Sequence, residues 1–242
     1  MSVLILMYHR ARVGRFGNSP EMLDAHFAHV AKTYPTVLPG DAVSPGRLQV
    51  CLTFDDAYFD FRARVFPLLK RHGLRALLAV PTSFIREQVE VPEEKRLEVE
   101  SEDAFRDPDS GGFCTAPELT EMATSGQVVL AAHGMTHVRL DDDDADLVRE
   151  VESPQSFLRS RLRQRVDSFV FPYGRFSPLA LAAARRHYRH VLRIGGAINR
   201  GWDQDVLYRV DADAMETPSS LFAPGRLLRY RVRLLWNRLR SR

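Results

Sequence analysis

The fold of this chain is decided by the run Val50-Cys51-Leu52-Thr53-Phe54-Asp55-Asp56. An apolar segment with the character of a buried strand ends there directly in two adjacent carboxylates. Neighbouring side chains of a strand point to opposite faces, so both carboxylates can serve one site only where the strand ends and the backbone turns. Such strand ends carry the catalytic groups of α/β enzymes. The same pattern also fits a strand followed by a helix that an aspartate caps.

Two histidines follow a second apolar run, in Leu130-Ala131-Ala132-His133-Gly134-Met135-Thr136-His137. The spacing of four residues brings both imidazoles to one side of a single turn. With eight histidines in the chain, such a pair has little meaning alone. Two histidines and a carboxylate, however, form the open three-ligand set of a catalytic divalent metal. A second aspartate beside the ligand can then act as a base on water.

Strand-like and helix-like segments alternate along the chain. This order predicts a parallel sheet with helices outside it, closed or nearly closed into a barrel. The predicted strands cover residues 3–7, 49–54, 76–80, 128–132 and 168–171, with short ones around Val191 and Leu207. The predicted helices cover residues 61–72, 115–125, 147–162 (interrupted at Pro154) and 178–187.

Three motifs occur in a fixed order: Thr53-Phe54-Asp55-Asp56, the two-histidine motif, and Phe171-Pro172-Tyr173-Gly174. Together with the opening Ile5-Leu6-Met7-Tyr8-His9-Arg10, they resemble the polysaccharide deacetylases of the fourth carbohydrate esterase family. The likeness covers about residues 3 to 213. It implies an α/β fold, an irregular (β/α)7 barrel. We therefore expect a catalytic barrel over residues 1–220 and a C-terminal basic amphipathic helix over residues 221–242.

The resemblance also implies roles for the motif residues. Asp55 matches the general base of the family, whereas Asp56, His133 and His137 match the metal ligands. Tyr173 matches the tyrosine whose backbone N–H binds the oxyanion. The implied cofactor is a divalent metal ion, and the ligand types make zinc the expected ion.

Two family residues are missing. Val170 stands where many members carry an arginine that orients the base, and no Leu-x-His motif follows His190, the last histidine. His9, at the exit of the first strand, is our candidate for the missing general acid; alternatively it only fixes the strand end by hydrogen bonding. Arg209 is our candidate for orienting Asp55 from another strand; alternatively it is an ordinary surface arginine.

The predicted reaction is hydrolysis of an N-acetyl group on an amino sugar in a glycan or glycan precursor. Biosynthesis of cell-surface polysaccharide or lipopolysaccharide is the expected setting. Cleavage of an O-acetyl ester would use the same site, and so would hydrolysis of a non-sugar amide. Because two motif residues are missing, the alternative from another class is a catalytically silent glycan-binding or scaffold protein that keeps the metal for stability.

Composition favours one soluble domain in the cytoplasm. The 242 residues can bury one substantial core, and the two cysteines suggest no disulfide framework. The first strand lacks a basic leader and a cleavage site, so we expect no signal peptide. The N-acetylated sugar is therefore expected to be an intracellular precursor. It could be a small free sugar, a nucleotide-linked sugar, a lipid-linked sugar or part of a polymer.

Two charged segments lie outside these motifs. Residues 86–112 form an acidic insertion, ten acids against four basic residues, which suits either a mobile lid or a solvated loop. Residues 225–242 hold seven arginines and no acid on an amphipathic pattern. That pattern suits peripheral contact with an anionic membrane on its inner face, or a helix docked on its own barrel. No nucleic-acid recognition module accompanies the charge, so no nucleic-acid partner is expected.

Overall fold

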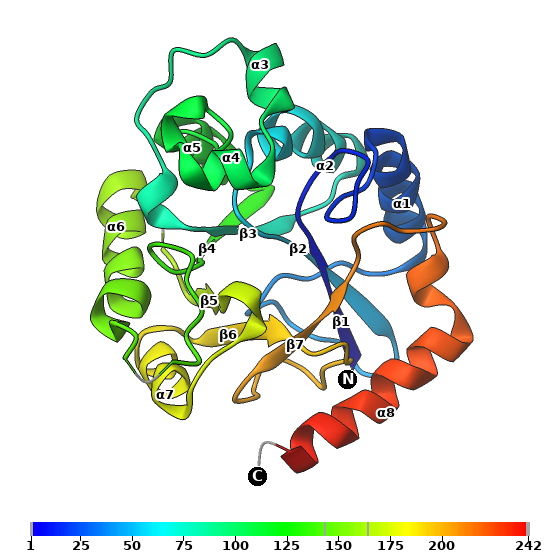
Figure 1. Ribbon diagram of the computed structural model, residues 1–242. Helices are drawn as coiled ribbons and strands as arrows, with labels where there is room; N and C mark the ends of the chain where they lie inside the picture. Colours follow the sequence, from blue (N-terminus) through cyan, green and yellow to red (C-terminus); the bar gives the residue numbers. More distant parts are fainter. Residues whose placement is uncertain (1, 143, 164, 241–242) are drawn as a thin grey trace.

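Seven parallel strands close into a barrel in the computed structural model, which describes residues 2–142, 144–163 and 165–240 (Figure 1). Neighbours in the barrel are also neighbours in sequence, and β1 pairs with β7 to close it. The strands are β1 (Ser2–Tyr8), β2 (Leu48–Phe54), β3 (Ala76–Val80), β4 (Val128–Ala132), β5 (Ser168–Val170), β6 (His190–Ile194) and β7 (Leu207–Asp211). The predicted parallel (β/α)7 barrel is confirmed.

Helices surround the barrel in Figure 1. They are α1 (Pro20–Thr33), α2 (Phe66–His72), α3 (Glu93–Glu98), α4 (Ser101–Arg106), α5 (Ala116–Thr124), α6 (Ser153–Leu162), α7 (Pro178–His187) and α8 (Pro224–Arg240). The π-helical turns η1 (Phe61–Val65) and η4 (Val148–Glu152) lead into α2 and α6, and the short 3-10 turns are η2 (Thr82–Phe84), η3 (Pro108–Ser110), η5 (Pro172–Gly174) and η6 (Ser220–Phe222).

Local signals set several helix ends where the sequence predicts them. Thr115 and Glu118 form the capping box of α5, and Gly73 ends α2 in the left-handed conformation at φ 62°. Pro154 stands in the first turn of α6, where its missing N–H costs no helical hydrogen bond. Helix α1 lies outside the predicted elements, although Ser19 caps it by accepting from the Met22 N–H at 3.2 Å.

Alternating side chains divide the core into two layers. The barrel interior is a cluster that includes Val3, Ile5, Cys51, Leu77, Ala79, Ala131, Val170, Leu192 and Leu207, and a larger cluster fills the space between strands and helices. The inward rows continue toward the C-terminal strand ends with Thr53, Asp55, His133 and Arg209. Polar groups from different strands are thereby brought to one rim of an apolar barrel.

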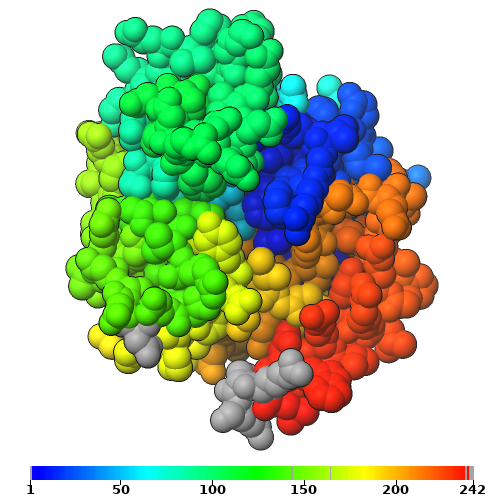
Figure 2. Space-filling view, in the orientation of Figure 1, coloured from blue at the N-terminus to red at the C-terminus, as the bar shows by residue number. Residues whose placement is uncertain are grey.

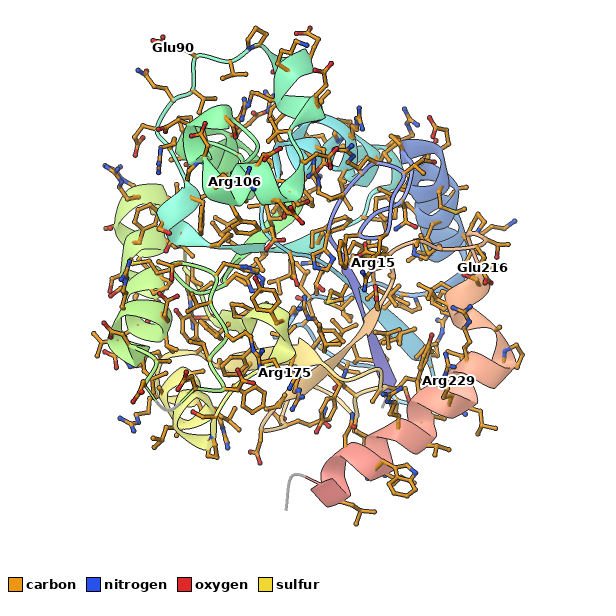
Figure 3. All side chains as sticks on the ribbon, in the orientation of Figure 1. Arg15, Glu90, Arg106, Arg175, Glu216 and Arg229 are labelled. Atoms are coloured by element: carbon orange, nitrogen blue, oxygen red, sulfur yellow. The ribbon has the colours of Figure 1, made fainter. Side chains whose placement is uncertain are left out.

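The acidic insertion, residues 86–112, is folded against the barrel and forms a lobe at the top of the view (Figures 1 and 2). It contains α3, α4 and η3, so it is not an irregular solvated loop, and the alternative of a mobile lid stays a prediction. Arg96 is 5% exposed and holds the lobe: its guanidinium donates to the carbonyls of Gly111 and Phe113 and makes a two-pronged ion pair with Glu118 at 2.7 and 2.9 Å. Figure 3 labels Glu90 and Arg106, which mark this lobe.

Helix α8 packs along the outside of the barrel (Figure 1). Tyr230 and Leu234 are buried, and the Tyr230 carbonyl accepts from the Ile198 N–H at 3.3 Å. The helix begins at Pro224, three residues after the predicted start at residue 221, because residues 220–222 form the turn η6. It extends to Arg240, and residues 241 and 242 lie outside the described part of the chain. Among the helices of the described residues, none has the length and apolar character that a bilayer crossing requires.

Candidate active site

Strand β2 ends at the carboxylate pair, and the backbone turns there as the sequence required. The Asp55 N–H donates to the Tyr8 carbonyl at 2.9 Å and extends the pairing of β2 with β1 by one residue. Asp56 and Ala57 then adopt left-handed conformations with φ of 72° and 55°. This turn aims both carboxylates into one site instead of to opposite faces, at the conformational cost that such residues carry.

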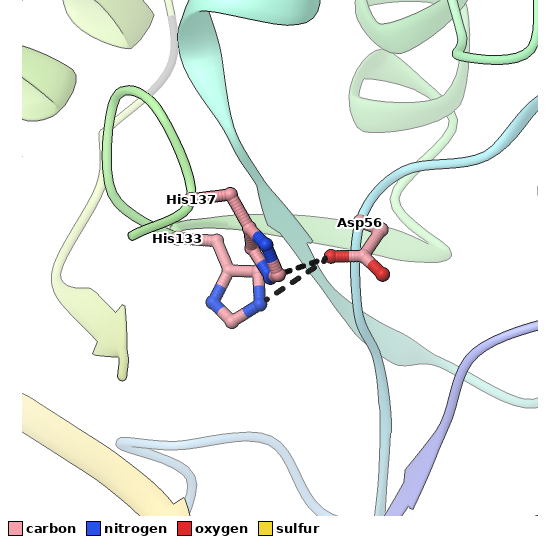
Figure 4. Close-up of side chains that lie close together, drawn as sticks. All are labelled: Asp56, His133 and His137. Carbon is pink, nitrogen blue, oxygen red and sulfur yellow. Dashed lines mark ion pairs between the residues drawn. The ribbon is translucent and has the colours of Figure 1, made fainter. Parts of the chain in front are cut away.

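Strand β4 delivers the two histidines to the same rim. The His133 ring donates from Nδ1 to the Val170 carbonyl at 2.8 Å, which leaves Nε2 as the free nitrogen facing the carboxylates. The loop that follows turns through Gly134 at φ 74°, and His137 itself is left-handed at φ 55°. Both imidazoles thereby face Asp56 (Figure 4).

Glu150 of η4 holds this loop in place. Its carboxylate is 3% exposed and accepts from the N–H groups of Met135 and Thr136 at 3.0 and 2.9 Å, and from the Thr136 hydroxyl at 2.6 Å. Because these bonds fix the backbone between the two histidines, Glu150 positions His137 without touching it. Gly134 lies under the same carboxylate, where an added Cβ would come within 3.2 Å of it.

Asp56, His133 and His137 are brought together as the sequence predicted, and their donor atoms suit a divalent metal ion. Asp56 Oδ1 lies 3.5 Å from His133 Nε2 and 3.2 Å from His137 Nε2 (Figure 4). Ligands of a tetrahedral zinc ion, at about 2.0–2.2 Å from the metal, lie about 3.3 Å from one another. Asp56 Oδ1 is moreover a buried oxygen that has no hydrogen-bond partner. The residues therefore fit the ion that their pattern implies.

Arg209 of β7 forms a two-pronged ion pair with Asp55. Its guanidinium is 1% exposed and donates from Nη1 to Oδ1 at 2.6 Å and from Nη2 to Oδ2 at 2.8 Å. The alternative of a surface arginine is thus wrong. Nη1 also lies 3.3 Å from the Thr53 hydroxyl. The two-pronged bond fixes the orientation of the carboxylate and leaves its ionised form favoured in a buried place.

His9 lies at the exit of β1 and contacts two carboxylates. Its Nδ1 is 2.5 Å from Asp213 Oδ2, and its backbone N–H donates to Asp213 Oδ1 at 3.1 Å. Its Nε2 is 3.9 Å from Asp55 Oδ2. The ring is partly exposed, so it faces the open side of the site with one nitrogen while Asp213 holds the other.

Aromatic rings form the walls around His137. Tyr173, in the left-handed conformation at φ 56°, lies with its ring 4.8 Å from the His137 ring. Phe105 of α4 stacks on the His137 ring, with the ring centroids 4.7 Å apart and an interplanar angle of 23°. The acidic insertion therefore contributes an aromatic wall to the site.

The charges of the site set the protonation of its groups. Burial raises the pKa of Asp55, but Arg209 and the nearby histidines outweigh this and leave the pKa below its ordinary value. Burial also raises the pKa of Asp56, and His137 and His133 again lower it below the ordinary value. Burial lowers the pKa of His133 to about 4, so its imidazole is neutral and able to bind a metal.

The pKa of His9 is shifted upward, in contrast to the pKa of His133. Burial alone would lower its pKa, but the hydrogen bond to Asp213 and the charge of Asp55 raise the pKa to about 9. The pKa of Asp213 is itself raised by burial and lowered in part by His9. Because the two groups share one proton at 2.5 Å, we place that proton on His9, where two carboxylates stabilise it.

Three residues of this site were missed by sequence reasoning. Asp213 follows β7 and had a weak signal, since it continues the strand exit that carries Arg209. Glu150 and Phe105 sit in helical turns far from the motifs and had none. Their roles arise only because η4 and α4 pack against the loop at His137.

The structure places an Asp-His-His cluster at the C-terminal rim of a parallel seven-stranded barrel, which is the rim where barrel enzymes carry their active sites. The sequence profile of the family described as Polysaccharide deacetylase matches residues 42–191. The chain belongs to this family.

Individual relatives are distant. The "Putative polysaccharide deacetylase YxkH" of Bacillus subtilis (strain 168) is 23% identical over 218 residues, which cover 85% of this chain and 70% of that protein. The solved structure of the Streptococcus pyogenes deacetylase PplD in complex with acetate superposes with a TM-score of 0.72 at 21% identity, covering 92% of this chain and 97% of the other. The structure of a de-N-acetylase from Aggregatibacter actinomycetemcomitans superposes with a TM-score of 0.70 at 18% identity, covering 89% of this chain and 97% of the other. These structural similarities establish the shared barrel fold.

Proposed function

We propose that this protein is a metal-dependent hydrolase that removes the acetyl group from an N-acetylated amino sugar. One observation carries the proposal: Arg209 holds the Asp55 carboxylate beside Asp56, His133 and His137, whose donor atoms all lie within 4.8 Å of one another and could hold a metal ion. A structural metal site has all its coordination positions filled by protein ligands, and it has no use for a neighbouring base. Asp56, His133 and His137 are the residues that would hold the ion.

A divalent ion bound there would polarise the acetyl carbonyl and lower the pKa of a water molecule toward neutrality. Asp55 is placed to accept a proton of that water. Its Oδ2 lies 3.9 Å from the Nε2 atoms of both His9 and His133, so it faces the space between the ligands and the open side of the site. Its lowered pKa keeps it ionised, and Arg209 keeps it oriented, at neutral pH.

His9 is the proposed general acid. Attack of water on the acetyl carbon must be followed by breakage of the carbon–nitrogen bond, and an amine leaves only when it gains a proton. His9 carries that proton because its pKa is raised to about 9, and Asp213 holds the ring so that Nε2 faces the site. The products are acetate and the free amino sugar.

The Tyr173 backbone N–H is the proposed donor to the oxyanion that forms on the acetyl group. The left-handed conformation of Tyr173 turns the chain at η5, next to His137. Its side chain is 58% exposed, so the ring is free to line the entrance for a sugar.

The structure weakens the motive for a silent scaffold. That alternative rested on two missing motif residues, the arginine before Tyr173 and the late histidine. Arg209 and His9 supply a guanidinium and a protonated imidazole at Asp55 from other strands. The same groups would also cleave an O-acetyl ester, because an alcohol leaves more easily than an amine.

We further propose that the substrate is a precursor of cell-surface polysaccharide or lipopolysaccharide on the cytoplasmic side, where the sugar can be carried by a nucleotide or a lipid. The family match supports an acetylated carbohydrate as the substrate class. Finding the protein in the medium or periplasm of its host would contradict the cytoplasmic setting.

The test is acetate release from a panel of N-acetylated and O-acetylated sugars by protein loaded with Zn²⁺ or Co²⁺. Asp55→Asn is the matched control, since it keeps the three ligands and removes the base. We expect acetate from at least one N-acetylated sugar with the wild type and a loss of about 10²-fold or more with the variant. Bound metal without acetate release across the panel would refute the proposal and favour the scaffold.

A further inference from the structure

Helix α8 has two apolar faces, and only one of them packs on the barrel. Tyr230 and Leu234 are 4% and 5% exposed, and Leu234 joins a small cluster with Ala197, Val206 and Tyr208. The sequence pattern suggested a single broad stripe. The structure divides it, because the docked residues lie on one side of the helix and the remaining apolar residues on nearly the opposite side.

The second face, which we name the apolar stripe, points to solvent. Its members lie within about 100° of the helix circumference, since each residue advances the helix by about 100°. They are 44–68% exposed, which is high for five large apolar side chains on one helix. The apolar stripe comprises Leu228, Val232, Leu235, Trp236 and Leu239.

Arginines border the apolar stripe on both sides. Arg229 and Arg233 lie along one edge of it and Arg231 along the other, and all three are exposed. The helix from Pro224 to Arg240 contains no acidic residue. Figure 3 labels Arg229 on α8, and Figure 2 shows the helix at the edge of the molecule.

We infer that α8 docks the protein on a bilayer that contains anionic lipid. The apolar stripe enters the boundary between headgroups and acyl chains, and the bordering arginines contact lipid phosphates. An exposed apolar stripe with a tryptophan and arginines on its flanks is the pattern of a helix that lies in the membrane interface. The inference goes beyond the proposed chemistry and does not depend on it.

A second copy of the chain is a poorer occupant. Two α8 helices packed stripe to stripe would bring the arginine borders of both copies together, and neither helix offers a carboxylate to neutralise them. A bilayer with anionic headgroups satisfies both features of the surface at once. Each arginine close to such a surface strengthens binding by about fivefold.

Vesicle flotation tests the inference on the full chain. Wild-type protein should float with vesicles of phosphatidylcholine and phosphatidylglycerol in equal parts, at least tenfold more than with pure phosphatidylcholine, and 0.5 M salt should reduce binding. The variant Leu235→Glu/Trp236→Glu should lose at least tenfold in binding. The matched control is Leu179→Glu, which changes a 61% exposed leucine on α7 and should bind like the wild type.

A second readout needs no destabilising variant. Trp236 is 59% exposed, whereas Trp202 is 9% exposed and donates to the Asp41 carbonyl. Emission of the wild type should therefore shift to the blue on anionic vesicles, and Trp236→Phe should abolish the shift. No flotation and no shift with the wild type would overturn the inference, as would equal binding by the stripe variant.

The remaining outcomes are also decisive. A dimer in light scattering that the stripe variant converts to a monomer, without vesicle binding, would assign the stripe to a second copy and overturn the lipid. Acetate release from a soluble substrate should be the same for the wild type and the folded stripe variant. Failure of vesicle binding is therefore distinguishable from failure of the proposed hydrolase.

Discussion

The ion pair between Arg209 and Asp55 gives the sharpest test of the site, through the variant Arg209→Met. Methionine keeps much of the volume of the arginine stem but removes both charged hydrogen bonds to Asp55. The carboxylate, 3% exposed, would then be buried without its partner. Two hydrogen bonds to charged groups at about 1.5–3 kcal/mol each, or a broken buried pair at about 3–5 kcal/mol, give the same order of magnitude. We expect the free energy of unfolding to fall by about 3–5 kcal/mol at pH 7.

The pH dependence has a definite sign. The pKa of Asp55 is lowered in the folded protein, so its contribution to stability is present above the unfolded pKa of about 3.9 and is lost as the pH falls below it. In Arg209→Met the burial of Asp55 raises its pKa instead. The stability gap between wild type and variant should therefore be largest near neutral pH and shrink as the pH falls and Asp55 takes up a proton.

The change in the free energy of unfolding is measured by urea unfolding of protein from which a chelator has removed any metal. Arg209→Met is combined with Asp55→Asn in a double-mutant cycle. We expect a coupling energy of about 2–3 kcal/mol between the two positions. The matched control cycle is Arg96→Met with Glu118→Gln, a two-pronged, largely buried pair that joins the insertion to α5. Both cycles should show coupling, but only Arg209→Met should move the acid limb of kcat/KM to higher pH. Additivity within about 0.5 kcal/mol at Arg209 and Asp55 would refute the pairing.

Three further predictions concern the groups around this pair. His9→Gln should lower kcat on an N-acetylated sugar by about 10²–10⁴-fold, with metal retained, and remove the fall in wild-type activity as the pH rises through about 9; near wild-type turnover would exclude His9 as the acid. Glu150→Gln should weaken metal affinity by about 10–100-fold in a chelator competition, whereas Glu152→Gln on the same turn should not, and equal affinities would show that the loop holds itself. Phe105→Leu should weaken metal binding several-fold through the lost contact with His137, while Phe84→Leu, which borders Phe105 in the same aromatic group, should leave it unchanged; identical effects would assign the loss to general loosening of the lobe.

The barrel and the centre of the site could be predicted because their signals are local. The strand β2 ends in Asp55 and Asp56, and β4 ends shortly before His133 and His137, so parallel pairing alone brings these groups to one rim. The turn that unites the two carboxylates was also implied, since strand geometry forbids any other solution. The left-handed φ of Asp56 is that turn.

The other residues of the site could not be predicted, because their positions depend on packing between distant segments that the sequence does not show. Glu150 stabilises the loop at His137 from η4, and Phe105 covers His137 from an insertion that reads as an acidic, aperiodic segment. Most acids of that segment lie outward, and a few arginines, above all Arg96, fix it to the barrel. Helix α1 is a different case. Its apolar positions Leu23, Phe27 and Val30 follow a helical period after Ser19 and Pro20, so its signal was present in the sequence.

The two departures from the family pattern are explained by one property of a barrel: inward positions on different strands face the same small space. Val170 on β5 and Arg209 on β7 both point into the interior, and Val170 packs in its apolar cluster. Arg209 already pairs with Asp55, so a second arginine in this interior would be a buried charge without a partner. The same reasoning applies at the exit of β1, where His9 faces Asp55 and is held by Asp213 from the end of β7. The proposed chemistry requires a guanidinium and a protonated imidazole at defined points around Asp55. It does not require that any particular strand supply them.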